Sequence, residues 1–428
     1  MQLQNTEPNV LKIIAGKLFD SYTLELLENR VITVSEDSGI ILDVQPFSSS
    51  THGLNFSDSQ IIDLRHLTVL PGFVDTHVHF FLHPYSETSW EDQLTKEHVV
   101  ERTVRATQHA KRTLMAGFTA VRDLGTEGAG EADIALRKCL SNPGALIPGP
   151  RYFCATRAIV STGSYGPKSV IHVNREGIEG ITGAEAADGR DECMKVVRRQ
   201  VGAGADWIKI YADYRVRSRV INVSSPAGKE SICTFTSDEL KTMIDTAHRY
   251  GVKVAAHATN KDTITELLRH SVDSIEHGYD MASYDPDHTD KSLDEPLRTC
   301  SQSRVKWCPT LAAYFTLGQG HGETWEHAVQ SFKAALACGM DNIACGGDTG
   351  VFAHGENALE LVLMNRLGAD WRKVLKWATL GGWEGFIGDI IATSGNFESD
   401  FESAVSADNI QFVMKGGKVY KRDGRPLL

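Results

Sequence analysis

The chain has 428 residues, which is more than one minimal domain needs and fits a barrel of roughly 250 residues with an appendage. Hydrophobic residues make up 41% of the sequence and charged residues 23%, as in an ordinary soluble globular protein. The formal net charge of −11 argues against nucleic acid or an anionic membrane as a partner, because both attract a basic face.

Cysteine usage and the amino-terminal residues indicate a compartment. The 8 cysteines are scattered and form no C-x-x-C pair, which predicts reduced thiols rather than a disulfide framework. The first residues are polar and lack a basic flank with an apolar core, so no signal peptide is evident. No apolar run approaches the roughly 20 residues that cross a bilayer. We therefore expect a cytoplasmic protein.

Both ends of the chain have the pattern of short β-strands. Apolar runs alternate with turn residues near the start, at the spacing of a β-meander, and predict strands at 11–15, 23–27, 31–34 and 40–44. Near the other end, strands are predicted at 389–393, 410–415 and 418–421, with Gly416 and Gly417 as a hairpin turn. Because neither piece can bury a core alone, we expect the two to pair as one small β domain.

Between these ends the chain alternates strand and helix. Strands are predicted at 61–74, 118–123, 152–155, 207–211, 253–257, 274–277, 305–309 and 343–346. Helices are predicted at 96–116, 130–140, 191–202, 237–250, 261–270, 293–301, 324–338 and 370–380, with Ser237 as an N-cap. Eight β/α steps are the count of a closed parallel barrel.

The predicted fold class is therefore α/β, a distorted (β/α)8 TIM barrel with a small composite β domain formed by both termini. We assign residues 71–384 to the barrel. Residues 1–70 and 385–428 are assigned to the two parts of the composite β domain.

The first barrel strand ends in two histidines. Residues 68–79 read Thr-Val-Leu-Pro-Gly-Phe-Val-Asp-Thr-His-Val-His, an apolar run followed by His77 and His79. Strand side chains alternate faces, so these two imidazoles point to the same side. Neutral imidazole is the commonest nitrogen ligand of metals in proteins. A His-x-His alone is nevertheless more often a pair of partly exposed histidines at a strand end.

The ends of later strands add further candidate ligands to this pair of histidines. Active sites of such barrels lie at the carboxyl ends of the strands. Read in order, those ends carry His77, His79, Lys209, His257, His277 and Asp348. Each residue has a plain alternative, such as a helix cap or a loop hydrogen bond. Four imidazoles and a carboxylate around one pocket would together cost free energy without a partner, so the set predicts a divalent metal.

Lys209 is the odd member of the set. A protonated lysine offers three donors and no acceptor, so it cannot bind a cation. Taken alone, it is more often an exposed residue at the end of a strand.

The ordered set resembles the metal-dependent amidohydrolase superfamily, in particular its imidazolonepropionase-like branch with prolidase-type dipeptidases and ochratoxinase-type carboxypeptidases. The resembling segments span almost the whole chain: 70–79 (LPGFVDTHVH), 204–210 (GADWIKI), 254–259 (VAAHAT), 274–278 (SIEHG), 346–349 (GGDT) and 412–420 (FVMKGGKVY). The resemblance implies two divalent metal ions. His77, His79 and Asp348 would bind one and His257 and His277 the other.

In that family the lysine reacts with carbon dioxide, and the resemblance therefore implies a carbamylated Lys209 as a bridging carboxylate. Zinc is the expected metal because the ligands are rich in histidine, with manganese or cobalt as alternatives. Two ions that share a water lower its pKa enough to supply hydroxide near neutral pH, and one ion polarises the scissile carbonyl. Asp348 is the predicted catalytic residue, which takes the proton and passes it to the leaving amine.

The loop that follows Lys209 suggests how a substrate is held. Residues 211–219 begin with Tyr211 and include three arginines, of which Arg215 is the nearest to Lys209. Arginines near a pocket predict a two-point clamp for a substrate carboxylate. A solvated, charge-rich loop is an equal alternative for any single arginine.

Three further residues are candidates for the substrate pocket. Tyr165 stands where relatives carry the histidine of a Gly-Gly-His-Gly turn, so it can donate to an oxyanion but cannot shuttle a proton near pH 7. His83 and Tyr314 are predicted to line the pocket, although a lone tyrosine is more often part of the packing.

The junction near Gly385 departs from the family pattern. Relatives have a longer segment between the last helix and the closing β piece, whereas here Trp383 and Glu384 run almost directly into residues 385–390. We expect stability or assembly to be affected before chemistry, because the junction lies away from the predicted ligands.

These features predict a binuclear metal-dependent amidohydrolase that cleaves an amide bond next to a carboxylate, in an N-acyl amino acid or a dipeptide, and forms a homo-oligomer. A deaminase or cyclic-amide hydrolase is the alternative enzyme, but mononuclear relatives of that kind lack the strand-four lysine. A non-catalytic scaffold protein on the same fold is the alternative of another class, and such proteins usually lose ligands.

Overall fold

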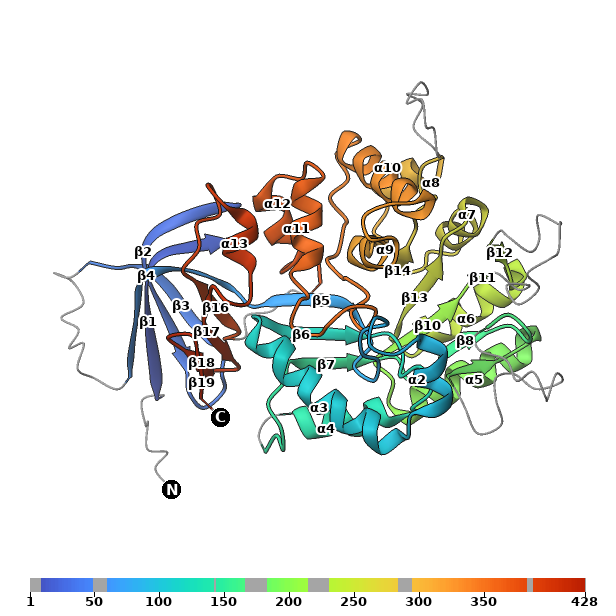
Figure 1. Cartoon of the computed structure of the whole chain (residues 1–428), viewed down its shortest axis with the longest axis horizontal. Coiled ribbons are helices and arrows are strands. Elements are labelled where there is room, and N and C mark those ends of the chain that lie inside the picture. Colours follow the sequence, from blue (N-terminus) through green and yellow to red (C-terminus); the bar gives the residue numbers. More distant parts are fainter. Residues whose placement is uncertain are drawn as a thin grey trace.

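The structure, a computed structural model, describes residues 9–48, 60–141, 144–165, 183–214, 231–283, 295–382 and 388–427. A β-rich part at one end holds the first and last strands of the chain, and a barrel of strands and helices forms the rest (Figure 1).

The β-rich part is one eight-stranded sheet in the order β19-β18-β17-β16-β4-β1-β2-β3. Its strands are β1 (Val10–Asp20), β2 (Glu25–Ser35), β3 (Ile41–Pro46), β4 (Ile61–Pro71), β16 (Ile390–Thr393), β17 (Ile410–Lys415), β18 (Lys418–Arg422) and β19 (Arg425–Pro426). The two ends of the chain meet where β4 pairs antiparallel with β16, with Leu70 opposite Ile391. The predicted composite β sheet and the turn at Gly416 and Gly417 are confirmed.

One prediction for this sheet is wrong. Residues 23–27 and 31–34 were expected as separate strands, but residues 25–27 and 31–34 belong to the single strand β2, which pairs with β1 from end to end, and residues 23–24 lie in the turn before it. The apparent turn signal is Asn29, which adopts a φ of 48° inside the strand. Asparagine tolerates this left-handed conformation better than most residues, so a turn-forming residue is accommodated without a turn.

The barrel strands form two arcs. One arc is β5 (Phe73–Val78), β6 (Phe118–Asp123) and β7 (Arg151–Cys154). The other follows the order β15-β14-β13-β10-β8-β9, and its strands are β8 (Ala158–Val160), β9 (Ala184–Ala186), β10 (Trp207–Tyr211), β13 (Lys253–Ala258), β14 (Ser274–His277) and β15 (Lys306–Cys308). A short ribbon of β11 (Asp213–Tyr214) and β12 (Ile232–Cys233) follows β10.

The eighth barrel position holds an irregular segment rather than the predicted strand at 343–346. Residue Ile343 forms an isolated bridge with Trp307, and Thr349 forms one with Val78 at the end of β5. The backbone N–H of Thr76 also donates to the carbonyl of Cys345 at 2.9 Å. Segment 343–349 therefore closes the barrel between β15 and β5, which accounts for its distorted form.

Helices surround the barrel in alternation with its strands. They are α2 (Trp90–Lys96), α3 (Val99–Met115), α4 (Ala132–Leu140), α5 (Gly189–Ala203), α6 (Ser237–Arg249), α7 (Lys261–Arg269), α8 (Glu295–Ser301), α9 (Leu311–Gly318), α10 (Glu323–Ala337), α11 (Leu359–Arg366) and α12 (Trp371–Trp377). Helix α13 (Phe401–Val405) instead connects β16 and β17 of the β-rich part. The predicted helix at 96–116 begins later, as α3, and residues 293–294 of another lie outside the described residues.

The predicted Ser237 cap is wrong by one position. Thr236 is the N-cap of α6: its side chain accepts from the backbone N–H of Glu239, and the Glu239 carboxylate accepts from the backbone N–H of Thr236. This reciprocal pair satisfies two donors that the first helical turn leaves free.

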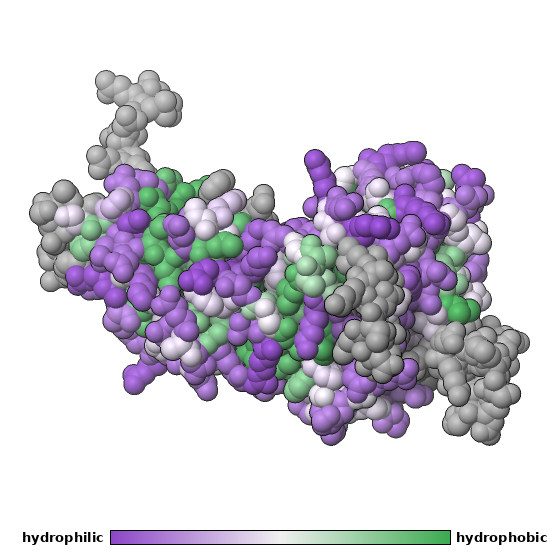
Figure 2. All heavy atoms as spheres, turned by 90° about the horizontal axis from the view of Figure 1, so that it is seen from above, coloured by the Kyte–Doolittle hydropathy of each residue, from purple (hydrophilic) through white to green (hydrophobic). Residues whose placement is uncertain are grey.

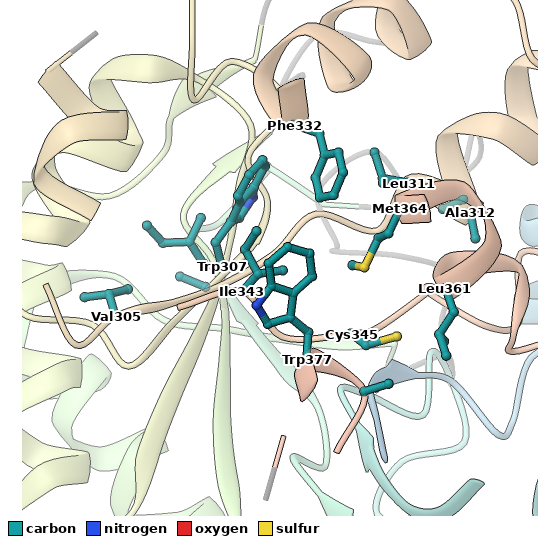
Figure 3. Packing of buried hydrophobic residues seen from close by; sticks show 14 of the residues in the cluster. Val305, Trp307, Leu311, Ala312, Phe332, Ile343, Cys345, Leu361, Met364 and Trp377 are labelled. Carbon is teal, nitrogen blue, oxygen red and sulfur yellow. The ribbon is translucent and has the colours of Figure 1, made fainter. Parts of the chain in front are cut away.

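The largest hydrophobic core extends through the barrel and many of its helices, and one part of it lies between β15 and helices α10 to α12. Trp307 of β15, Phe332 of α10 and Trp377 of α12 are almost fully buried in it and lie close together in Figure 3. Burying such side chains contributes about 1.5–3 kcal/mol each, so this region fixes where β15 and segment 343–349 lie.

The surface has both hydrophilic and hydrophobic areas. The visible face is mostly hydrophilic, with hydrophobic residues gathered over the β-rich end (Figure 2). On the edge strand β3, Leu42 and Val44 are 50% and 43% exposed. No helix among the described residues is long and apolar enough to cross a membrane. The homo-oligomer stays a prediction, and the junction at Gly385 lies outside the described residues.

Gly72 joins the β sheet to the barrel, and we predict that Gly72→Ala destabilises the protein. A Cβ there would lie 2.1 Å from Oγ1 of Thr119, a buried β-branched residue with little freedom to move. The expected loss is about 1–3 kcal/mol in the free energy of unfolding, measured by urea denaturation.

Gly202→Ala in α5 is the matched control, because a Cβ at Gly202 would meet nothing within 4 Å. This exchange should leave stability unchanged or raise it by up to about 1 kcal/mol. Equal denaturation midpoints for Gly72→Ala and the wild type would contradict the close contact with Thr119.

Candidate metal centre

His77, His79 and Asp348 form one compact group at the carboxyl end of β5. Oδ1 of Asp348 lies 3.6 Å from Nε2 of His77 and 3.2 Å from Nε2 of His79. All three ligand atoms lie within 4.8 Å of one another, as a single ion requires.

The other two histidines continue the group across the barrel. The ring centroids of His77 and His277 are 5.1 Å apart, and those of His277 and His257 are 4.5 Å apart. The four imidazoles therefore form a continuous row from His79 to His257, although they come from three different strand ends.

Hydrogen bonds set the orientation of three of these rings. Nδ1 of His77 bonds to the Glu276 carboxylate at 2.8 Å, and Nδ1 of His79 bonds to the carbonyl of Gly125 at 2.8 Å. Both oxygens only accept, so Nδ1 carries the proton and Nε2 keeps its lone pair. Nδ1 of His277 bonds to the Thr310 hydroxyl at 2.9 Å. This arrangement suits metal binding through Nε2.

His257 differs from the other three histidines in the ring nitrogen that is free to bind a metal. Its Nε2 lies 3.8 Å from Oδ1 of the buried Asp213, which leaves Nδ1 as the nitrogen for a metal. The Asp213 carboxylate is itself held by the backbone N–H groups of Thr259 and Asn260, at 2.8 and 2.9 Å. The loop after β13 thus fixes the Asp213 carboxylate next to the His257 ring.

Two site residues have a left-handed backbone. φ is 72° at His277 and 61° at Asp348, a conformation that costs roughly 1–2 kcal/mol per residue outside glycine. Consecutive strand residues alternate faces. The turn at His277 lets both Glu276 and His277 reach His77.

Lys209 is 0% exposed, and its Nζ has no hydrogen-bond partner among the described residues. Burial lowers the pKa of this amine from its ordinary value. A buried amine without a partner costs free energy, which indicates that a further group belongs at this position.

Asp348 remains a carboxylate in these surroundings. Burial alone would raise its pKa, but attraction to His77 and His79 holds the pKa well below its usual range. Its backbone N–H donates to the carbonyl of His77 at 2.9 Å. Side chain and backbone of Asp348 are therefore both anchored to the first metal-binding strand.

A buried ion pair supports His77 and was not predicted from the sequence. Glu276 accepts from Nη2 of Arg122 at 2.7 Å and from the hydroxyl of Ser274, in addition to its bond with His77. The available signal was a charged residue inside the predicted strand 274–277, next to a predicted ligand.

Asp75 was also missed. It accepts from the backbone N–H of His77 at 3.0 Å, from Thr349 at 3.1 Å and from Asn357 at 2.8 Å. It ties β5 to the segment that carries Asp348. The signal was an acidic residue in the otherwise apolar run before His77.

The predicted tyrosines lie beside the metal residues. The Tyr211 ring packs 5.0 Å from that of His257, and the Tyr165 ring stacks on Tyr211 at 5.3 Å. Both hydroxyls donate to the carboxylate of Glu127. In this arrangement the Tyr165 proton is not available to an oxyanion, and the role of both tyrosines in substrate binding stays a prediction.

The other substrate residues are placed differently. His83 contacts Glu97 at 2.8 Å and Glu87 at 3.2 Å and lines a separate cavity with His109, so the geometry gives no support to His83 as a substrate residue. Tyr314 lies 6.1 Å from the His277 ring. Arg215 lies outside the described residues.

Residues 68–420 match the model of the amidohydrolase family, and the chain belongs to this family of hydrolases that act on carbon–nitrogen bonds. The ochratoxinase of Aspergillus niger is 25% identical over 394 residues, which cover 83% of this chain and 76% of that protein. The predicted resemblance is thus confirmed at the level of the family and its prolidase and ochratoxinase relatives.

Solved structures confirm the fold. A Xaa-Pro dipeptidase with methionine bound in its active site has a TM-score of 0.76 at 28% identity, over 96% of this chain and 100% of that chain. The crystal structure of A. niger ochratoxinase has a TM-score of 0.76 at 24% identity, over 97% and 96%.

We predict that Glu276→Gln lowers metal affinity roughly 10- to 100-fold, because the carboxylate that orients His77 is lost. The measurement is a competition titration of chelator-treated protein with Zn²⁺ in bicarbonate buffer. Glu266→Gln on α7, which removes a carboxylate paired with Arg269, is the control and should not change affinity. Folded Glu276→Gln protein with wild-type affinity would show that the carboxylate does not orient the ligand.

Proposed function

We propose that this protein is a binuclear metal-dependent amidohydrolase that cleaves an amide bond next to a carboxylate, in a dipeptide or an N-acyl amino acid. The observation that carries the proposal is the row of four histidines with Asp348 at one end and the unpartnered amine of Lys209 beside it. Family membership and the likeness to a Xaa-Pro dipeptidase support it.

The donor set fits two divalent ions. His77, His79 and Asp348 would hold one, and His257 and His277 the other, with zinc expected from the histidine-rich ligands. When bound, such a pair lowers the pKa of a water molecule and polarises the amide carbonyl. The hydrogen bonds at the Nδ1 atoms of His77, His79 and His277 support this assignment, because they leave Nε2 free.

Lys209 would join the two ions as a carbamate. Its neutral amine attacks carbon dioxide, a proton leaves, and the product is a carboxylate with two oxygens. This change converts a residue that, when protonated, can only donate into one whose two carboxylate oxygens can accept or bind a cation. The complete burial of Nζ without a hydrogen-bond partner supports it, because a carbamate would replace the unsatisfied amine.

Asp348 would move the proton. Its carboxylate accepts a proton from the attacking water and donates it to the nitrogen of the leaving amine as the amide bond breaks. The two contacts with His77 and His79 hold this carboxylate at the metal residues, which supports the role.

The substrate class rests on two lines of support. The similar solved structures include a Xaa-Pro dipeptidase with bound methionine, and a prolidase in complex with N-methylphosphonate-L-proline shares the fold at 22% identity. The loop with Arg215 adds the predicted clamp for a substrate carboxylate. Both favour an amino acid derivative with a free carboxylate.

The function is tested by incubating metal-replete protein with a library of dipeptides and N-acyl amino acids and assaying released amino acid. Chelation should abolish hydrolysis, and Zn²⁺ should restore it. His257→Ala should retain one ion of the two and lose most activity, as elemental analysis and kinetics would show. Full activity with a single ion per chain would exclude the binuclear assignment, and release of ammonia instead of amino acid would indicate a deaminase.

We also predict that Lys209→Ala lowers kcat roughly a hundredfold or more, because the bridging carboxylate is lost. Acetate or propionate should restore part of the activity by filling the vacated space. Wild-type protein equilibrated with ¹³C-bicarbonate should give a carbamate signal in ¹³C NMR that the variant lacks. Lys241→Ala, an exposed lysine on α6 paired with Asp245, is the control. A Lys209→Ala variant as active as this control would contradict the role of Lys209.

A further inference from the structure

Glu127 is a buried carboxylate that the proposed chemistry does not use. It is 2% exposed and follows β6 in a loop. The hydroxyl of Tyr211 donates to its Oε1 at 2.8 Å, and its Oε2 accepts from the hydroxyl of Tyr165 and from Nε1 of Trp90 at 3.3 Å. All three donors are neutral, so the charge of the carboxylate is not balanced by them.

Among the described residues, no lysine or arginine nitrogen lies within 4.0 Å of this carboxylate. Arg102 on α3 comes near, but its guanidinium donates to the backbone carbonyls of Thr126 and Glu127 instead. Arg102 thus attracts Glu127 only from a distance. A buried carboxylate that no cation contacts costs free energy, and a cation that arrives with the substrate would lower this cost.

Glu127 also lies between the two groups of metal residues. The carbonyl of Gly125, two residues before it, accepts from Nδ1 of His79. On its other side, the tyrosine bonded to its Oε1 packs against the ring of His257. The backbone at Glu127 is strained, because its φ of 49° lies in the left-handed region.

Aromatic rings surround the carboxylate. The Tyr165 ring lies 5.6 Å from Trp90, 5.3 Å from Tyr211 and 6.1 Å from Tyr214. The Tyr214 ring lies 6.0 Å from that of His257, so the aromatic group reaches the second pair of metal residues. Aromatic faces attract cations and have no such preference for anions.

We infer that Glu127 binds a cationic group of the substrate, namely the α-ammonium group of a dipeptide. This inference rests on the proposed amide hydrolysis. In a dipeptide the α-nitrogen is two bonds from the scissile carbonyl carbon, about 2.5 Å away, so the residue that binds it must border the metal ligands. Glu127 meets this condition, because the carbonyl of Gly125, two residues before it, accepts from His79, and the hydroxyl of Tyr211 donates to its carboxylate. An N-acyl amino acid carries no charge there and is the poorer substrate.

The test compares the best dipeptide of the library with its des-amino analogue, in which hydrogen replaces the α-ammonium group. The wild type should show a kcat/KM for the dipeptide that is roughly ten- to hundredfold higher, as one charge-assisted hydrogen bond provides. In Glu127→Gln this ratio should fall close to one, mainly through slower dipeptide cleavage.

Glu131→Gln is the matched control, because it removes a carboxylate from the same loop that is paired with Arg157 and Arg199 away from the metal residues. It should leave the ratio unchanged. Tyr165→Phe removes one donor to Glu127 but keeps the carboxylate, so its ratio should stay at the wild-type value.

If the wild type cleaves the dipeptide and its des-amino analogue equally well, the inference is wrong. This result would leave the proposed amide hydrolysis unaffected, and it requires no variant of the protein. An equal loss on both substrates in Glu127→Gln would also overturn it, because the carboxylate would then only position Tyr165 and Tyr211. Cleavage of neither substrate by metal-replete wild type would instead refute the proposed function.

Discussion

The buried ion pair between Glu276 and Arg122 is the interaction on which the metal centre depends. Both groups lie inside the barrel, where an uncompensated charge is strongly unfavourable, and breaking such a pair costs about 3–5 kcal/mol. The pair holds the carboxylate against Nδ1 of His77, which fixes the ring orientation. Arg122 also donates to the carbonyl of Thr76, so β5, β6 and β14 meet at this one ion pair.

Backbone geometry supplies a second constraint. The barrel closes through segment 343–349, which forms isolated bridges instead of a regular strand. This irregular path, with a left-handed Asp348, directs the carboxylate towards His77 and His79. Asp75 secures the same segment through Thr349 and Asn357. These hydrogen bonds stabilise the segment that contains the left-handed Asp348.

The residues that lie next to the candidate metal ligands differ in chemical character from the ligands themselves. On the metal side, imidazoles are oriented by oxygen acceptors, and their free nitrogens converge. Beside His257, the hydroxyls of Tyr165 and Tyr211 instead donate to the carboxylate of Glu127. Aromatic rings and a carboxylate thus lie next to the metal residues at this end of the row of histidines.

Periodic apolar patterns determined the barrel, the composite sheet and the strand ends that carry the histidines, because burial follows local alternation along the chain. Strand-end position alone brought His77, His79, Lys209, His257, His277 and Asp348 into one group. The predicted break between residues 27 and 31 was wrong, because Asn29 adopts a left-handed φ within a continuous strand. The tertiary structure alone decided the partners of each group: Glu276 with His77 and Arg122, and Glu127 with the two tyrosines. These contacts join residues far apart in the chain, and whether a buried charge has a partner depends on three-dimensional packing, which no local pattern specifies.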